Sequence, residues 1–132
     1  MTKNIIIGKR SIISNELSKS LKNTQIFSAN NLNANYVNKI NSFNKINLIF
    51  NNFFPSKNLN NLSLKNYELF LKLSLEKQIY LLSKIPKNKI NKIIYTSSSA
   101  VYRLFENLDT QKKDHFNRDL YSSFKLSSEK LI

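Results

Sequence analysis

The sequence predicts an α/β fold with a parallel sheet of about four strands. Four short runs rich in branched apolar residues read as strands, namely residues 5–7, 25–27, 46–50 and 90–95. Between them, apolar residues recur every three or four positions, which is typical of helices. Strands that alternate with helices indicate βαβ units, whose strands run parallel.

The first third of the chain predicts a strand, a helix, a strand and a weak helix. Residues 5–7 are Ile-Ile-Ile and end at Gly8, the only glycine, which indicates a strand buried on both faces. A helix should follow and end near Asn23. Its apolar positions are Ile12, Ile13, Leu17 and Leu21. Residues 25–27 predict the second strand. The Asn-rich stretch 30–44 predicts one weak helix, because Asn side chains compete for backbone groups.

The middle of the chain predicts a strand at residues 46–50 and then the clearest helix. That helix should run over residues 64–85, with Ser63 as its N-cap and Pro86 as its stop. We expect its apolar side chains to form core or helix contacts. They are Leu64, Tyr67, Leu71, Leu75, Ile79, Leu82 and Ile85.

The last third predicts one more strand and one more helix. Residues 90–95 read as another buried strand, residues 103–117 as a polar loop, and a final helix should begin near Leu120 and still be running at Ile132. The chain between the second strand and Ile46 is too short for an additional strand with its helices. We therefore expect one βα unit to be reduced or lost there.

The positive net charge makes nucleic acid an alternative partner, but a less favoured one. The 132 residues include 21 Lys and Arg against 8 Asp and Glu, a formal charge of +13, and phosphate neutralisation is the usual reason for such a balance. Only three of the basic residues are Arg, the residue that reads bases and phosphates in a bidentate way. Lys, Asn and Ile are enriched together, as AT-rich codons would produce, so we expect nucleic acid not to be the main partner.

Cysteine, histidine and hydropathy exclude several kinds of site. Without Cys the chain has no disulfide, thiolate metal site or cysteine nucleophile, which suits a cytoplasmic protein. A single His, His115, without a close pair of carboxylates predicts no metal site. Every apolar run is shorter than the roughly 18 residues of a membrane span, so we expect no membrane partner.

The first candidate motif lies between the first strand and the first helix. Gly8, Ser11 and Ser14 have the spacing of a G-x-x-G-x-x-G turn, with Ser in place of the second and third Gly. Small residues in such a turn let backbone amides and the helix N-terminus approach a pyrophosphate. A plain strand–helix turn stays open as the alternative.

Two further motifs carry hydroxyls and a lysine. Residues 96–99 are Thr-Ser-Ser-Ser and follow a predicted strand, where a hydroxyl can donate to a substrate oxygen or serve in a plain turn. Tyr121 and Lys125 lie four positions apart and so on one helix face. A lysine there can favour the phenolate and make the tyrosine a general acid/base near neutral pH. An ordinary amphipathic face can also carry such a pair.

Together these motifs resemble the extended short-chain dehydrogenase/reductases, in particular the NAD-dependent epimerase/dehydratase family that acts on nucleotide sugars. The resemblance covers most of the chain. It is most specific in the S-S-x-x-V-Y segment at residues 97–102 and in the Y-x-x-x-K pair Tyr121 and Lys125. It implies a Rossmann-like sheet with flanking helices, in which residues 1–132 are the N-terminal part of an NAD(P)-binding domain.

The resemblance also implies a hydride-transfer site. Tyr121 would exchange a proton with a sugar hydroxyl, Lys125 would bind the nicotinamide ribose and lower the tyrosine pKa, and Ser98 would hydrogen-bond the same substrate oxygen. The implied cofactor is NAD or NADP, and the end of the second strand has no Asp, Glu or Arg to choose between them. The implied cofactor-binding residues are Gly8, Ser11, Ile12, Ser14, Asn51, Ser97, Tyr121 and Lys125. Asn51 can equally cap a turn.

The implied partners are a nucleotide-sugar substrate and a second copy of the chain. In the family, the helices that correspond to residues 64–85 and 120–132 form the dimer bundle. Family members continue past the Y-x-x-x-K helix into a region that binds the nucleotide sugar, so we expect weak or no catalysis from residues 1–132. The alternative is a non-catalytic module that keeps the fold and associates through its helices.

Overall fold

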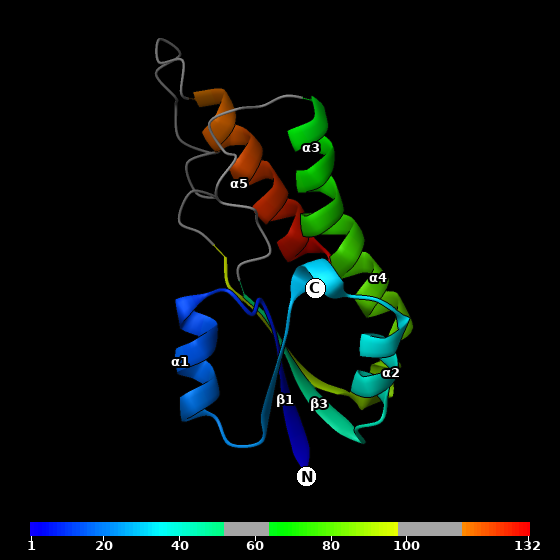
Figure 1. Cartoon of the computed structure of the whole chain (residues 1–132). Coiled ribbons are helices and arrows are strands. Elements are labelled where there is room, and N and C mark those ends of the chain that lie inside the picture. The colour runs from blue at the N-terminus through cyan, green and yellow to red at the C-terminus, as the bar shows by residue number, and fades with distance from the viewer. Residues whose placement is uncertain (52–63, 98–114) are drawn as a thin grey trace. The chain divides into compact units, whose positions relative to one another are not determined.

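The computed structural model describes residues 1–51, 64–97 and 115–132, with the backbone alone for 64–66 and 115–121 (Figure 1). The elements are β1 (Thr2–Ile7), α1 (Ile12–Ser20), β2 (Thr24–Phe27), the 3₁₀ turn η1 (Ala29–Asn31), α2 (Ala34–Asn41), β3 (Lys45–Phe50), α3 (Leu64–Leu71), the π-helical turn η3 (Lys72–Glu76), α4 (Lys77–Lys84), the 3₁₀ turn η4 (Lys87–Lys89), β4 (Ile90–Tyr95) and α5 (His115–Lys130). They fall into two compact units. The sheet unit comprises Met1–Phe53 and Lys77–Thr96, and the helical unit comprises Phe54–Glu76 and Ser97–Ile132.

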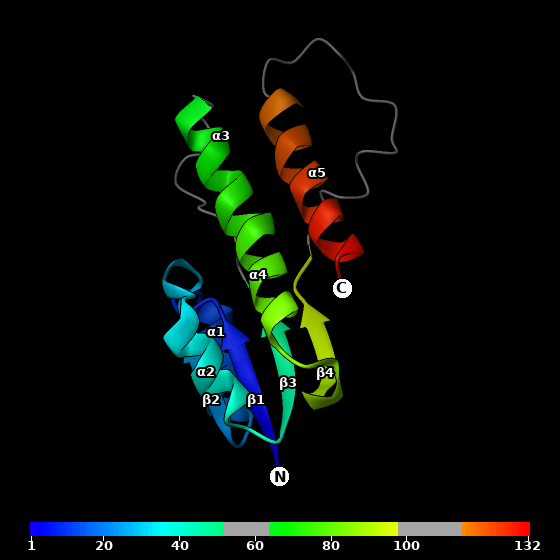
Figure 2. The ribbon, with the colours of Figure 1, turned by 90° about the vertical axis from the view of Figure 1, so that its right-hand side faces the viewer.

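The sheet unit contains the predicted α/β fold. Its four strands are all parallel and lie in the order β2-β1-β3-β4 (Figure 2). Helix α1 lies on one face of the sheet, and α2 and α4 lie on the other (Figures 1 and 2). Residues 28–44 hold η1 and α2 but no strand, as expected from the short length of this segment.

The core of the sheet unit is built on β1 and β3. Ile5, Ile6 and Ile7 are fully buried, as a strand covered on both faces requires. The ring of Phe27 meets Tyr36 of α2 edge-on, with centroids 5.1 Å apart. The other buried apolar residues of this unit are Leu32, Val37, Ile40, Ile46, Leu48, Ile49, Phe50, Leu81 and Ile85.

The prediction that residues 90–95 form a buried strand is half right. These residues form β4, but no side chain of the strand is fully buried, and Ile94 is 44% exposed. The reason is position, because β4 is one of the two edge strands of the described sheet. Its pairing with β3 is also irregular: Ile46 pairs with Ile90 and Asn47 with Lys92, which leaves Asn91 as an extra residue in a β-bulge.

Helix α1 differs from the prediction at both ends. Ile12 and Ile13, expected on its apolar face, are 80% and 54% exposed, and Ser14 is its buried residue. The helix ends at Ser20 and not near Asn23, because Leu21 turns to an extended conformation and Asn23 takes a left-handed one (φ 58°).

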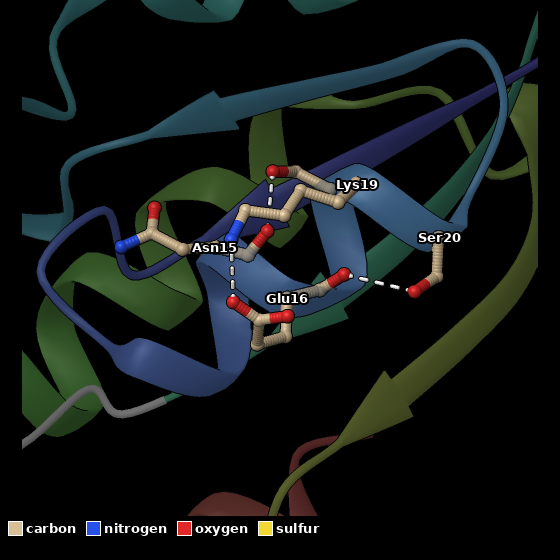
Figure 3. Close-up of polar contacts among 5 residues, drawn as sticks. Asn15, Glu16, Lys19 and Ser20 are labelled. Carbon is tan, nitrogen blue, oxygen red and sulfur yellow. Dashed lines mark hydrogen bonds and ion pairs between the residues drawn. The ribbon is translucent and has the colours of Figure 1, made fainter.

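The outer face of α1 carries local polar contacts only (Figure 3). Lys19 and Glu16 form an exposed ion pair of 2.7 Å, and the Ser20 hydroxyl donates to the Glu16 carbonyl (3.1 Å). The Ser18 hydroxyl donates to the carbonyl of Asn15 (2.7 Å). Exposed pairs of this kind add little stability, so this face of α1 is a solvated surface.

Residues 64–84 are helical as predicted, but the line of buried side chains differs from the predicted apolar stripe. Tyr67 and Ile79 of that stripe are 44% and 49% exposed. The buried side chains are Phe70, Ser74, Gln78, Leu81 and Ile85. An apolar pattern could not reveal this line, because two of its members are polar and the π turn η3 interrupts the regular helix. The predicted cap Ser63 lies outside the described residues.

The last helix begins earlier and ends sooner than predicted. Helix α5 starts at His115, which was expected in a polar loop, because Phe116, Leu120 and Phe124 continue a four-residue apolar repeat back to this point. The helix ends at Lys130. Two tighter bonds, from the amide of Leu131 to the Ser128 carbonyl (3.3 Å) and from that of Ile132 to Glu129 (3.2 Å), follow it.

A row of asparagines links the strands near their amino ends. The Asn91 side-chain nitrogen donates to the side-chain oxygen of Asn47 (2.8 Å), and that of Asn47 donates in turn to Asn4 (2.8 Å). Asn4 donates to the carbonyl of Lys22 (2.9 Å). The amides therefore form one directed chain of hydrogen bonds across β4, β3 and β1.

Burial predicts very different costs for two truncations in neighbouring strands. Leu48 on β3 is fully buried, whereas Ile94 on β4 is 44% exposed. We expect Leu48→Ala to lower the free energy of unfolding by about 2–5 kcal/mol through lost burial and the cavity left behind. Ile94→Ala should lower it by less than about 1 kcal/mol. Urea denaturation followed by circular dichroism measures both, and equal losses would contradict the burial described for β4.

Candidate functional site

The candidate site of the sheet unit lies where β1 and β3 end. The strand order reverses here, because the chain passes from β1 to β2 on one side and then returns across β1 to β3. Backbone bonds hold the strand ends together: the Gly8 amide donates to the Phe27 carbonyl and the Asn51 amide to the Ile7 carbonyl, both at 2.9 Å. In open parallel sheets, ligands bind outside the carboxyl ends of the strands at such a reversal.

Gly8 occupies a position that no other residue fits. Its φ is +130°, and a Cβ added there would lie 1.8 Å from the backbone oxygen of Asn51. Both the dihedral angle and the close approach require glycine. The turn after β1 therefore has the tight geometry that the first glycine of a dinucleotide turn provides.

The two serines that replace the other glycines turn their hydroxyls inward. The side-chain nitrogen of Asn51 donates to the hydroxyl oxygen of Ser11 (3.0 Å) and to that of Ser14 (2.9 Å). All three residues are buried, with 7% of Ser11, none of Ser14 and 1% of Asn51 exposed. The amide of Asn51 thus faces the start of α1, where it shapes the turn.

The first turn of α1 opens to solvent. Its first helical hydrogen bond runs from the Asn15 amide to the Ser11 carbonyl (3.2 Å), so the amides of residues 12–14 precede the helical bonding pattern and carry partial positive charge. Ile12 is 80% exposed. Lys9 and Arg10 are exposed beside it. This arrangement favours an anion at the turn.

The end of β2 lacks the group that commonly selects a dinucleotide. The residues at this point are Phe27-Ser28-Ala29-Asn30, with no carboxylate for ribose hydroxyls and no Arg for a phosphate. Phe27 is buried and Ser28 is half-buried. The end of β2 therefore offers no side chain that would distinguish NAD from NADP.

The helical unit holds a buried lysine, Lys125, on α5. Only 3% of it is exposed, and burial lowers its pKa from 10.5 to about 8, while the Glu129 carboxylate acts to raise it. Glu129 also accepts a hydrogen bond from the hydroxyl of Ser97, which is exposed after β4. The structure thus brings together Lys125 and Ser97, two of the predicted site residues, through Glu129.

Helix α5 is fixed by contacts with α3 and η3 that the sequence did not reveal. The ring of Phe124 lies 6.4 Å from Phe70 and 5.7 Å from Tyr67. The hydroxyl of Ser128 donates to the carbonyl of Ser74 in the π turn (3.4 Å). The Ser74 hydroxyl in turn donates to the carbonyl of Phe70, four residues earlier in the chain (2.5 Å). The predicted apolar stripe gave no signal of these contacts, because Phe70 and Ser74 lie outside it.

The structure describes the other two predicted catalytic residues only in part. Ser98 lies outside the described residues, and Tyr121 is described by its backbone, which places it in α5 one turn before Lys125. Within the described ranges, no three His, Asp or Glu side chains gather as a metal site would need. No described helix combines the length and the apolar character of a membrane-crossing segment.

A comparison of the chain with models of protein families and with curated proteins found no match to either.

Replacement of Gly8 tests the tight turn. We expect Gly8→Ala to lower the free energy of unfolding by about 2–5 kcal/mol, because the new Cβ meets the Asn51 carbonyl and the dihedral angle is strained. Lys9→Ala, at the exposed neighbouring position, is the matched control and should change it by less than about 0.5 kcal/mol. Urea denaturation of the two variants gives the comparison, and a Gly8→Ala protein as stable as Lys9→Ala would disprove the close approach.

The buried lysine predicts a rise of stability with pH. Between pH 8 and pH 10.5 the unfolded chain holds a proton on Lys125 that the folded chain has released, so the free energy of unfolding increases with pH across this window. We expect Lys125→Met to remove from this increase a share on the order of 2–3 kcal/mol. Lys130→Met, an exposed lysine on the same helix, should leave the increase as it is. Denaturation midpoints at pH 7.5 and 10.5 measure the effect, and parallel behaviour of the two variants would contradict it.

Proposed function

We propose that this protein binds NAD or NADP at the turn of residues 8–14, in the manner of the nucleotide-sugar epimerases and dehydratases that its motifs resemble. The observation that carries the proposal is Gly8. The only glycine of the chain stands at the first position of the turn, where the strand order reverses and where Asn51 leaves no space for a side chain.

The residues of the turn suit the pyrophosphate of such a cofactor. The amides of residues 12–14 and the positive end of α1 would receive its oxygens, and the exposed Lys9 and Arg10 add positive charge beside them. The hydroxyls of Ser11 and Ser14 are directed to Asn51, so they are held inward at the turn.

Tyr121 and Lys125 are the proposed acid/base pair. Their spacing of one helical turn places them on the same face of α5. With a pKa of about 8, Lys125 remains mostly protonated at neutral pH, and its charge would stabilise the phenolate of a neighbouring tyrosine. Tyr121 would then exchange a proton with a sugar hydroxyl, and Ser98 would hydrogen-bond the same oxygen. NAD or NADP, when bound, supplies the hydride-transfer chemistry.

Cofactor binding and turnover test the proposal at two levels. We expect the purified protein to bind NADH or NADPH with a change in nicotinamide fluorescence. If it converts UDP-sugars, which the absorbance of the nicotinamide reports, Tyr121→Phe should reduce the rate by about 100-fold or more, because it removes the acid/base group. Tyr67→Phe, at an exposed tyrosine of α3, is the control and should retain the rate.

A protein that binds neither nucleotide would disprove the proposal as a whole. Binding without turnover would retain the cofactor site and remove the catalytic assignment of Tyr121, Lys125 and Ser98.

A second candidate function is helix-mediated association without catalysis. Two large apolar side chains of α3, Tyr67 and Leu69, are 44% and 37% exposed, and exposed apolar residues on a helix favour contact with another chain. Size-exclusion chromatography with light scattering distinguishes the candidates when it is combined with the nucleotide titration. An oligomer that ignores both nucleotides would favour this second function.

A further inference from the structure

The positive charge of the chain is concentrated in the sheet unit. Met1–Phe53 and Lys77–Thr96 contain twelve Lys and Arg residues and one carboxylate side chain, Glu16, whereas the rest of the sequence contains nine Lys and Arg against seven Asp and Glu. Glu16 is itself paired with Lys19 (2.7 Å). A bias toward lysine codons raises the lysine count but does not remove carboxylates from one unit, so the uneven charge needs a second explanation.

Most of this excess charge lies where the four parallel strands begin. The helices α1, α2 and α4 end on this side of the sheet, at the opposite end of the strands from the turn of residues 8–14 (Figure 2). The described segments 21–24, 38–47 and 84–92 form this end and contain no carboxylate. Its five exposed lysines, which we call the basic end, are Lys22, Lys39, Lys45, Lys84 and Lys87.

Hydrogen bonds hold two of these segments together. The side-chain nitrogen of Asn41 donates to the carbonyl of Lys84, the last residue of α4 (3.0 Å). The ammonium group of Lys89 donates to the Asn41 carbonyl, and that of Lys45 donates to the carbonyl of Asn88 (2.7 Å). The ends of α2 and α4 and the starts of β3 and β4 are therefore tied to one another, which gives these lysines a fixed surface.

The segment that carries Lys22 is held in a similar way. The side-chain oxygen of Asn23 accepts a hydrogen bond from the Lys3 ammonium group (2.9 Å), and its nitrogen donates to the carbonyl of Thr2 (2.8 Å). The Lys3 ammonium group also lies 5.5 Å from the centre of the Phe43 ring, between α2 and β3. Contacts with the start of β1 thus fix the remaining part of the basic end.

The helix dipole explains only part of this arrangement. Lys39 and Lys84 lie in the last turns of α2 and α4, where a cation offsets the partial negative charge of the helix end. Lys45, however, is the first residue of β3, and strands are depleted in lysine. Like charges gathered on one surface repel each other and oppose folding. Their presence without carboxylates points to a polyanion that neutralises them.

The side chains between the lysines fit nucleic acid better than a lipid surface. Exposed asparagines alternate with the lysines at positions 38, 44, 88 and 91, and their amides can donate to phosphate and sugar oxygens. Apart from Met1, no large apolar side chain is exposed in the described segments of this end, whereas proteins that lie on membranes insert apolar side chains into the lipid. All five cations are lysines, which attract phosphates without the bidentate recognition of bases by arginine.

We propose that the basic end binds the phosphate backbone of nucleic acid without sequence preference. The surface lies at the opposite end of the strands from the turn proposed for NAD or NADP, so this binding does not depend on the cofactor. Contacts from lysines alone give weak, salt-sensitive association. Nucleic acid is therefore a second partner of the sheet unit, beside the dinucleotide.

Fluorescence anisotropy of the full chain with labelled DNA duplexes of two unrelated sequences tests the proposal. Each phosphate contact adds about −0.9 to the slope of log K against log salt concentration, so five contacts predict a slope of about −4 to −5. We expect the same slope for both sequences. Saturating NADH should not displace the duplex, because the two surfaces lie at opposite ends of the strands.

Two pairs of substitutions separate the basic end from the total charge. Lys39→Gln combined with Lys87→Gln should reduce the magnitude of the slope by about two, because each change removes one phosphate contact. Lys72→Gln combined with Lys130→Gln is the matched control, since it removes the same charge from two exposed lysines of the helical unit. The control should keep the slope of the natural sequence.

Four results overturn the proposal. A protein that does not bind the duplexes even at low salt has no such surface, and equal losses in the two pairs would assign binding to the net charge. Displacement of the duplex by NADH would assign it to the turn of residues 8–14. Binding to phosphatidylcholine vesicles that contain phosphatidylserine, with weaker binding to the duplexes, would make the partner a membrane. Except for displacement by NADH, which would itself show a nucleotide site, these results leave the proposed function untouched.

Discussion

The close approach of the Gly8 backbone to the carbonyl of Asn51 is the constraint on which the sheet unit depends. It brings the ends of β1 and β3 so near to each other that a single Cβ would not fit. Once these ends are fixed, the side chain of Asn51 reaches Ser11 and Ser14 and thereby sets where α1 begins. The single glycine of the chain lies at a position where the backbone leaves no space for a Cβ.

The helical unit follows a different principle, since it buries polar groups and a charge. Lys125 is almost fully buried, and desolvation of an ammonium group opposes folding. Glu129 partly offsets this cost, and it also holds Ser97. A group kept buried at the expense of stability is more typical of a functional site than of a core. The serines of this unit, Ser74 and Ser128, let α5 approach the π turn closely while their hydroxyls find backbone carbonyls.

The sequence was sufficient for the strands and insufficient for the polar contacts. Unbroken apolar runs such as residues 5–7 and 46–50 identify strands, because little else buries so many branched side chains in sequence. The same pattern overstated the burial of Ile94, since it carries no information on which strand is outermost. The turn at Gly8 was visible from its spacing with Ser11 and Ser14. Their partner Asn51 was recognised as a candidate, but its bonds join residues 40 and 37 positions apart, which only the fold brings together.

The bulge in β4 has a consequence for the behaviour of the protein at high concentration. An outermost strand offers unpaired backbone groups to any other chain, and regular strands of this kind are sites of aggregation. The extra residue Asn91 breaks the even spacing that a second strand would need to match, and the exposed Lys92 next to it adds a charge at the edge. The irregularity in the pairing of β4 with β3 thus also makes this edge of the described sheet less suited to the addition of a further strand.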